Sequence, residues 1–191
     1  MKQMKQWLAA VIVAGMTFVV GGCGGVSPQA AEAIQSGKTM YTQVGMWYEP
    51  NRRGVNQVIG TNYNVGIYVP ANTKVSMLSA VRNGVAVDVN GVEVHVLNVS
   101  KYTGLGDGAF VDRTFAAAPV DLGRFSKSER DAIKKGVIVK GMSKDAVIAS
   151  RGYPPAHATP SLDMDRWRYW KNRWATMYVN FQNGKVSGIE E

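Results

Sequence analysis

The stretch VAVDVNGVEVHVLNV, residues 85–99, alternates apolar and polar side chains on either side of the dipeptide Asn90-Gly91. In its second half three valines share one face, and Glu93 and His95 lie on the other. Asn-Gly between two alternating runs is the strongest short-range signal for a β-hairpin, because both residues tolerate the positive φ angles of the turn. The stretch therefore predicts two antiparallel strands that bury one face.

Similar runs surround this hairpin and extend a β-rich composition over residues 40–120. VGIYV (65–69) ends at Pro70, and TKVSML (73–78) ends near an Arg-Asn-Gly turn. β-Branched and aromatic residues bounded by such turn signals indicate short strands. We expect a β-rich domain here, either a small antiparallel sheet or an SH3-like barrel, because the segment IYVPANTKVSML resembles part of that barrel.

A glycine-rich segment, KYTGLGDGAF, follows the hairpin over residues 101–110. A phosphate-binding loop would need a Lys-Ser/Thr pair or a longer glycine spacing, and a helix that opens directly after the glycines. The sequence has neither feature. We therefore predict a flexible loop, followed by a connector in which Pro119 marks the domain boundary.

The apolar periodicity becomes helical after this boundary. Ser126 and Glu129 have the spacing of a capping box, and Gly136 is the residue type typically found just beyond a helix C-terminus. A second helix is predicted from Ser143 to Gly152, because it starts with a good N-cap and is followed by two prolines.

Three strand candidates close the chain, over residues 166–171, 174–181 and 185–189. The short connections between them favour antiparallel neighbours. Residues 121–191 are thus predicted to form two helices followed by a three-stranded antiparallel meander, and the whole chain is predicted to be α+β.

The first of these strands is rich in both aromatic and basic side chains. Basic residues interleaved with rings are typical of single-stranded nucleic-acid binders, but a strand pair that buries its rings has the same pattern. Alternation places Trp167 and Tyr169 on one face, which the helices can cover, and leaves the other face outward. The candidate interaction surface consists of Arg166, Arg168, Trp170 and Arg173.

The first 22 residues have the pattern of a secretory signal peptide. Two lysines precede an apolar run, residues 7–20, that is too short to span a bilayer comfortably. VGGC, residues 20–23, resembles a bacterial lipobox, which implies cleavage after residue 22 and acylation of Cys23. The small and polar residues up to 39 are then predicted to form a lipidated tether, residues 23–39.

This assignment predicts the periplasmic side of a membrane as the location of the folded part. By resemblance to enterobacterial sorting signals, Gly24 in place of an aspartate implies the outer membrane. Nucleic acid is not an expected partner there. The formal charge of +8, from 22 Lys and Arg against 14 Asp and Glu, is compatible with anionic lipid head groups, lipopolysaccharide phosphates or an acidic envelope protein. Peptidoglycan is a further candidate partner.

Catalytic chemistry is not expected from this sequence. His95 and His157 are the only histidines, and neither has the spacing of a metal site or of a Cys-His nucleophile pair. Ser161 and Asp163 lie close to His157, but the members of a catalytic triad normally converge from separate elements. We therefore predict no catalytic residue, no metal and no cofactor.

A spaced motif begins at the second predicted helix, and its second part is FQNGKV, residues 181–186, in the last hairpin. Its residues, expected to be structural, are Gly141, Met142, Ser143, Val147, Gly152 and Pro154. This part of the chain resembles the SmpA/OmlA family of small outer-membrane lipoproteins. The resemblance implies a BamE-like fold and a non-catalytic scaffold role in outer-membrane protein assembly or envelope integrity, with the β-barrel assembly machine as one candidate partner.

Two functions remain open at this point. The first is an outer-membrane-anchored protein-interaction module, which an exposed Trp170 within the candidate interaction surface would favour. The alternative is an SH3-like lipoprotein that binds peptidoglycan or a peptide. An exposed groove lined by Tyr48, Tyr63 and Tyr68 would favour this alternative.

Overall fold

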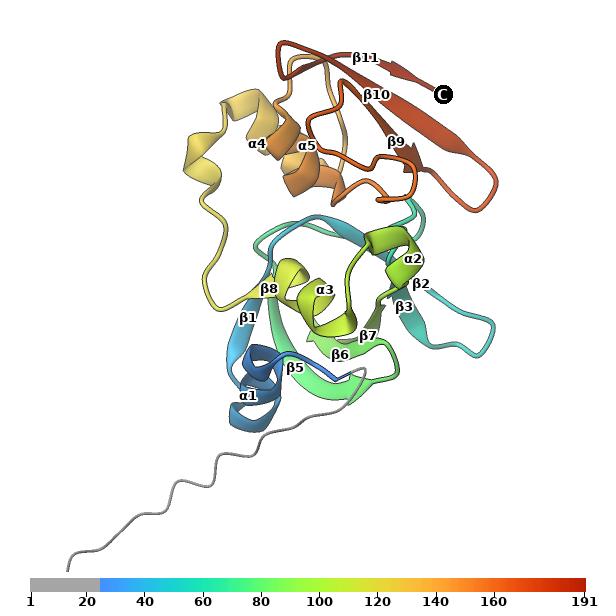
Figure 1. Ribbon diagram of the computed structural model, residues 1–191. Coiled ribbons are helices and arrows are strands. Elements are labelled where there is room, and N and C mark those ends of the chain that lie inside the picture. The colour runs from blue at the N-terminus through green and yellow to red at the C-terminus, as the bar shows by residue number, and fades with distance from the viewer. Residues whose placement is uncertain (1–24) are drawn as a thin grey trace, which may run out of the picture.

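The computed structural model describes residues 25–191, which contain two sheets (Figure 1). A curled eight-stranded sheet with helices α1–α3 forms the β-rich unit, residues 25–120, and a three-stranded sheet with α4 and α5 forms the C-terminal unit, residues 121–191. The predicted α+β class is confirmed. The expected signal peptide and Cys23 lie outside the described residues. Within the described range, no helix combines the length and the apolar character needed to cross a membrane.

The curled sheet has the strand order β4-β2-β3-β7-β6-β5-β1-β8. Neighbouring strands of this sheet run antiparallel, except β3 and β7, which run parallel. The prediction of an all-antiparallel sheet is therefore wrong at this pair. An unpaired β7 edge would expose its backbone N–H and C=O groups, and β3 satisfies them. The strands are β1 (Thr39–Thr42), β2 (Met46–Pro50), β3 (Asn56–Ile59), β4 (Ile67–Val69), β5 (Lys74–Val81), β6 (Gly84–Val89), β7 (Val92–Leu97) and β8 (Phe115–Ala116).

The hairpin predicted within residues 85–99 is confirmed as β6 and β7. Val89 pairs with Val92 across the turn, and the intervening Asn90 and Gly91 have φ angles of 54° and 85°. Positive φ at both turn positions matches the right-handed twist of the strands. Burial of each inward valine contributes about 1.5–3 kcal/mol to folding. The fully buried valines of the hairpin are Val85, Val87, Val94 and Val96.

The expected tether is shorter than residues 23–39. Helix α1 (Pro28–Ser36) starts at the N-cap Ser27 and buries Ala30 and Ala33 in the core of the β-rich unit. These alanines let the helix approach the sheet closely, because their side chains are small. Residues 28–36 are therefore part of the folded unit.

Two helices replace the flexible loop that we predicted over residues 101–110. They are α2 (Ser100–Thr103) and α3 (Asp107–Thr114). Phe110 and Val111 of α3 are buried in the core of the curled sheet. Their burial outweighs the low helix propensity of the glycines, a tertiary effect that local sequence does not report.

The C-terminal unit has the predicted order of elements. A short 3-10 helix, η1 (Leu122–Arg124), precedes α4 (Lys127–Lys135), which begins with the predicted capping box, and α5 (Lys144–Arg151) follows. The predicted meander is confirmed, with the order β11-β10-β9. Its strands are β9 (Arg166–Trp170), β10 (Thr176–Gln182) and β11 (Lys185–Glu190).

The two helices cover one face of this sheet, as strand alternation predicts. Trp167 and Tyr169 of β9 are buried against Val147 of α5, and Val179 and Phe181 of β10 belong to the same core. The opposite face of β9 and β10 points away from the helices.

The two units meet at an interdomain joint, formed by residues 45–48 and 62–68 on one side and by residues 133–136 and 149–152 on the other. The Gly45 amide donates to the Ala149 carbonyl at 2.9 Å. The Asn62 amide group donates to the carbonyls of Gly45 and Arg151 at 3.0 and 2.6 Å, and the Tyr68 hydroxyl donates to the Ile133 carbonyl at 2.6 Å. Because these bonds are directional and several converge, they hold the units in one arrangement.

Candidate functional site

Aromatic and cationic side chains form a continuous stack that crosses from the β-rich unit to the outer face of β9. The ring of Tyr102, on α2, lies 5.1 Å from the ring of His157, measured between centroids. The ring of His157 lies 5.3 Å from that of Trp170 at the end of β9. The guanidinium of Arg168 also lies over the indole of Trp170, 4.7 Å from its centroid.

The stack continues along the sheet to β10. Arg168 also lies 5.6 Å from the ring centroid of Tyr178, and Arg166 lies 4.0 Å from the same centroid. Rings and guanidinium groups attract each other because the negative face of the π system meets the cation. We call this set the cation–aromatic ladder: Tyr102, His157, Trp170, Arg168, Tyr178 and Arg166.

Strand geometry accounts for the outward direction of the ladder. Arg166, Arg168 and Trp170 alternate with the buried Trp167 and Tyr169, so they share the solvent side of β9. Tyr178 is the register partner of Arg168 on β10. A cross-strand pair of this kind has its side chains within contact distance.

The two arginines of the ladder differ in their polar partners. Arg166 donates to the Glu190 carboxylate at 2.6 Å, but both side chains are exposed and such pairs contribute at most about 1 kcal/mol. The Nε atom of Arg168 is buried and has no hydrogen-bond partner. Arg168 is therefore held mainly by the rings on either side of it.

Beyond the ladder, the turn between β9 and β10 presents a single large apolar side chain. Trp174 is 86% exposed, the highest value among the exposed large hydrophobic residues of the described chain. The Asn172 side chain accepts hydrogen bonds from the Trp174 and Ala175 amides at 2.8 and 2.9 Å, which fixes the turn. The guanidinium of Arg173 lies 5.6 Å from the Trp174 ring centroid. An exposed indole beside an arginine is the composition favoured at the centre of protein interfaces.

The structure brings together three residues of the candidate interaction surface. Arg166, Arg168 and Trp170 lie in the ladder, whereas Arg173 lies apart on the turn with Trp174. Trp170 is half-buried, and both His157 and Arg168 lie against its ring, so the freely exposed Trp170 that would favour the interaction module is not found.

Sequence reasoning missed the exposure of Trp174 and the role of Tyr178. We expected a strand over 174–181, but β10 begins at Thr176 and leaves Trp174 in the turn. The preceding Asn172 was an available turn signal. The positions of Tyr102 and His157 in the ladder had no sequence signal, because they come from separate loops and helices.

The exposed groove of three tyrosines that would favour the peptidoglycan- or peptide-binding alternative is not formed. Tyr48 is buried in the core of the β-rich unit. Tyr68 is half-buried in the interdomain joint, where burial raises the pKa of its hydroxyl far above the ordinary value, although nearby Arg151 opposes the shift. Tyr63 lines a separate small cavity of about 20 Å³ beside Trp47.

The SmpA/OmlA-like motif residues have structural positions. Gly141 lies shortly before α5 and Gly152 directly after it, and their φ angles are positive, at 88° and 77°. Met142, Val147 and Pro154 are buried. Ser143 is the N-cap of α5, where its hydroxyl accepts from the Ala146 amide at 3.3 Å.

Glu129 connects this motif to the first helix of the unit. Its carboxylate accepts from the Ser126 amide at 2.9 Å and from both the amide and the hydroxyl of Ser143 at 2.8 Å. Burial opposes the charge, but these hydrogen bonds outweigh it and lower the pKa of Glu129 to about 2. The carboxylate therefore links the N-termini of α4 and α5, and its role is structural.

The described residues contain no group of three or more histidine, cysteine or acidic side chains that could hold a metal ion. Comparison of the chain with protein-family models, with curated proteins and with solved structures finds no match. The arrangement of the ladder and of the Trp174 turn is suited to molecular contact.

Proposed function

We propose that this protein is an outer-membrane-anchored periplasmic lipoprotein that acts as a non-catalytic interaction module in envelope assembly or integrity. We also propose that its C-terminal unit is a BamE-like domain of the SmpA/OmlA type. The order of two capped helices and an antiparallel meander supports this assignment. The lipobox-like residues 20–23 support the anchor.

The observation that carries the interaction role is the exposed Trp174, which lies beside Arg173 on a turn held rigid by Asn172. A rigid indole loses little conformational entropy on binding and buries a large apolar area. The arginines of the turn and the ladder favour a partner with an acidic, partly apolar surface.

The placement of the turn fits an anchored protein. Figure 1 shows the turn between β9 and β10 at the right-hand side of the C-terminal unit, diagonally across the view from α1, near which the described chain begins. Only a few residues separate Cys23 from the N-cap Ser27. Acyl chains on Cys23 would therefore hold the α1 side close to the bilayer and leave the Trp174 turn to reach into the periplasm.

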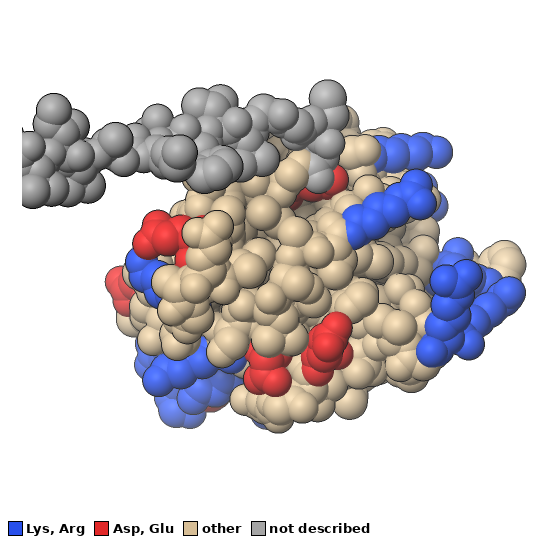
Figure 2. Space-filling model, turned by 90° about the horizontal axis from the view of Figure 1, so that it is seen from below, with Lys and Arg blue, Asp and Glu red and all other residues tan. Residues whose placement is uncertain are grey.

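The surface on the α1 side is compatible with this orientation. Figure 2 shows the molecule from below: neutral side chains cover much of this face, Lys and Arg side chains lie mostly around its rim, and several Asp and Glu side chains lie on the face and at its left edge. Basic side chains near a bilayer are attracted by anionic head groups.

Site-specific photo-crosslinking in cells tests the proposed partner surface. A photoreactive amino acid at position 174 of the full chain should give an adduct with an envelope protein, such as a component of the β-barrel assembly machine. Position 67 provides the matched control, because Ile67 is also exposed, at 59%, but lies on β4 of the other unit. Equal adducts from both positions would contradict the proposal.

The anchor has a separate test in the Cys23→Ala variant. Radiolabelled palmitate should be incorporated into the parent chain and not into the variant, and the parent should fractionate with outer membranes. Equal labelling of both chains would overturn the lipoprotein assignment without bearing on the Trp174 surface.

A further inference from the structure

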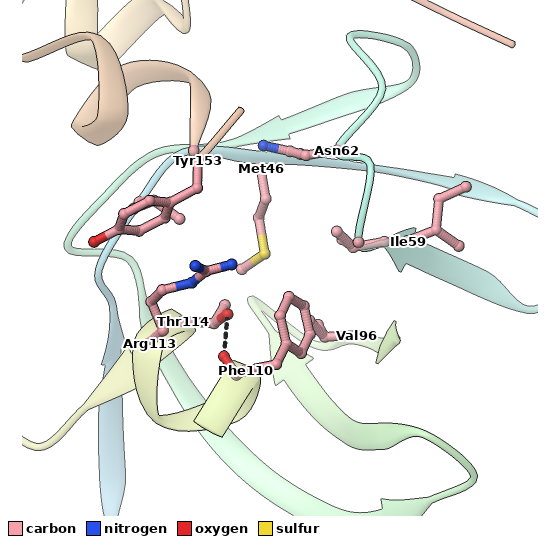
Figure 3. A pocket seen from close by; sticks show the side chains of 12 residues that line it. Met46, Ile59, Asn62, Val96, Phe110, Arg113, Thr114 and Tyr153 are labelled. Carbon is pink, nitrogen blue, oxygen red and sulfur yellow. Dashed lines mark hydrogen bonds between the residues drawn. The ribbon is translucent and has the colours of Figure 1, made fainter. Parts of the chain in front are cut away.

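A small apolar cavity lies inside the β-rich unit where it meets the residues that follow α5. Its volume is about 40 Å³, and its apolar lining includes Val58. Met46, Val96 and Phe110 also line it (Figure 3). Arg113 of α3 and Tyr153 form its outer wall. The same two residues also line a wider groove of about 550 Å³ on the surface between the two units. The cavity and the groove are therefore adjacent, with Arg113 at the point where they meet.

Arg113 is held by its flat face and leaves its edge free. Its guanidinium carbon lies 4.2 Å from the ring centroid of Tyr153. Figure 3 shows the group pointing across the cavity between Tyr153 and Met46. Stacking on a ring occupies the face of a guanidinium, whereas its N–H groups point outward in the plane. Those N–H groups form a fork that matches the two oxygens of a carboxylate.

Apart from Arg113, each charged side chain that lines the groove has a hydrogen-bond or ion-pair partner. Asp112 accepts from the Ser27 hydroxyl at 2.5 Å, and Asp121 accepts from the Gly123 amide at 2.8 Å. Arg124 and Asp145 form an ion pair at 3.6 Å.

Within residues 25–191, Arg113 has no hydrogen-bond acceptor and no carboxylate within ion-pair distance, and residues 1–24 contain no acidic side chain. Its nitrogens are not among the fully buried atoms that lack a partner, so they keep some exposure, and Arg113 lines the open groove. Burial lowers the pKa of the Arg113 guanidinium, with the Tyr153 hydroxyl opposing the shift, but an arginine keeps its charge at neutral pH. A free cation at the mouth of an apolar cavity is a site for an anion that carries a small apolar group.

We propose that this pocket binds the C-terminal carboxylate of a peptide whose last side chain is the size of alanine. The carboxylate accepts two hydrogen bonds from Arg113, the terminal methyl group enters the cavity, and the preceding residues lie in the groove. Cavity size selects the side chain: a dry cavity of about 150 Å³ holds a benzene ring, so 40 Å³ admits only a group of one or two carbon atoms.

Isothermal titration calorimetry of the full chain in a neutral detergent tests this proposal. The probe is the tripeptide acetyl-Gly-Gly-Ala with a free carboxylate, compared with the same peptide as a C-terminal amide. Loss of the charge-assisted hydrogen bonds should weaken binding of the amide about 10-fold to 100-fold. A peptide that ends in phenylalanine should bind at least about tenfold more weakly than the alanine peptide, because its ring exceeds the cavity.

The decisive variant is Arg113→Gln, with Arg82→Gln as the matched control, because Arg82 is exposed and lies outside both the cavity and the groove. Arg113→Gln should lose the difference between acid and amide, and Arg82→Gln should keep it, with circular dichroism to show that both remain folded. Equal binding of acid and amide by the parent chain, or an unchanged preference in Arg113→Gln, would overturn the proposal. Peptides that end in L-alanine and in D-alanine separate two sources of the ligand. Tighter binding of the L-alanine peptide points to a protein C-terminus, and tighter binding of the D-alanine peptide points to a cell-wall stem peptide.

Discussion

The guanidinium of Arg151 lies 4.6 Å from the ring centroid of Trp47 in the interdomain joint. Among the described residues, no carboxylate lies within ion-pair distance of it. Arg151 is only 2% exposed, and its Nε and Nη2 atoms have no hydrogen-bond partner. Burial lowers the pKa of Arg151 to about 10, although Tyr169 and Tyr68 oppose the shift. The last residue of α5 thus brings an unpaired cation into the contact between the two units.

Replacement of Arg151 by methionine should leave the free energy of unfolding within about 1 kcal/mol of the parent or raise it. Methionine keeps the unbranched stem that packs on Trp47 and removes the cost of burying a charge. Arg151→Ala should instead lose about 2–4 kcal/mol, because it leaves a cavity. Urea unfolding of both variants measures the difference. A larger loss in Arg151→Met than in Arg151→Ala would show that the charge itself stabilises the joint.

Gly136 is one of the positions at which the joint has no room for a side chain. It ends α4 with a φ of 66°, and an added Cβ would lie 2.7 Å from ring atoms of both Trp47 and Tyr68. Gly136→Ala should therefore cost about 1–3 kcal/mol more than Gly184→Ala. Gly184 has a similar φ of 72° and nothing within 4 Å of its added Cβ, so it isolates the cost of the backbone conformation. Equal losses in thermal unfolding would contradict the close packing.

Glu129 should make the stability of the protein dependent on acid pH. Its pKa falls from 4.5 to about 2 on folding, so its stabilisation is complete above about pH 4.5 and is lost as the pH falls towards 2. We expect a contribution on the order of 2 kcal/mol at neutral pH. Unfolding measured between pH 2 and 7 should be flatter for Glu129→Gln than for the parent. The exposed Glu190→Gln variant should follow the parent, and identical curves for both variants would contradict the role of Glu129.

The three tryptophans of the β9–β10 hairpin should differ in their contribution to stability. Trp174→Ala should change the free energy of unfolding by less than about 0.5 kcal/mol, because its side chain is exposed. Trp167→Ala should lose about 3–5 kcal/mol from the core, and Trp170→Ala about 1–2 kcal/mol from the ladder. Chemical denaturation monitored by far-ultraviolet circular dichroism ranks the three. A loss of several kcal/mol in Trp174→Ala would show that this residue is part of the fold.

Local patterns in the sequence predict much of the secondary structure. The turn at Asn90-Gly91, the capping box at Ser126 and the alternation through Trp167 and Tyr169 each report interactions between residues that are close along the chain. Such interactions depend on backbone preference and strand period, which the residue types carry with them. The same alternation predicts that Arg166, Arg168 and Trp170 share a face.

The remaining features depend on contacts between residues far apart in the chain. Helix α3 forms because Phe110 and Val111 fill the curled sheet, and β3 pairs in parallel with β7 because that strand edge is otherwise open. Neither cause is visible within a short window of sequence.

The sequence by itself determined the β6–β7 hairpin, the N-caps of α4 and α5 and the inward face of β9, because short-range sterics and periodicity set these. Only the tertiary structure decided that Tyr68 joins the two units, that His157 stacks on Trp170 and that Arg113 borders an apolar cavity. These relationships arise when separate elements pack together, because burial in the packed chain places side chains beside partners that their own neighbours in sequence do not specify.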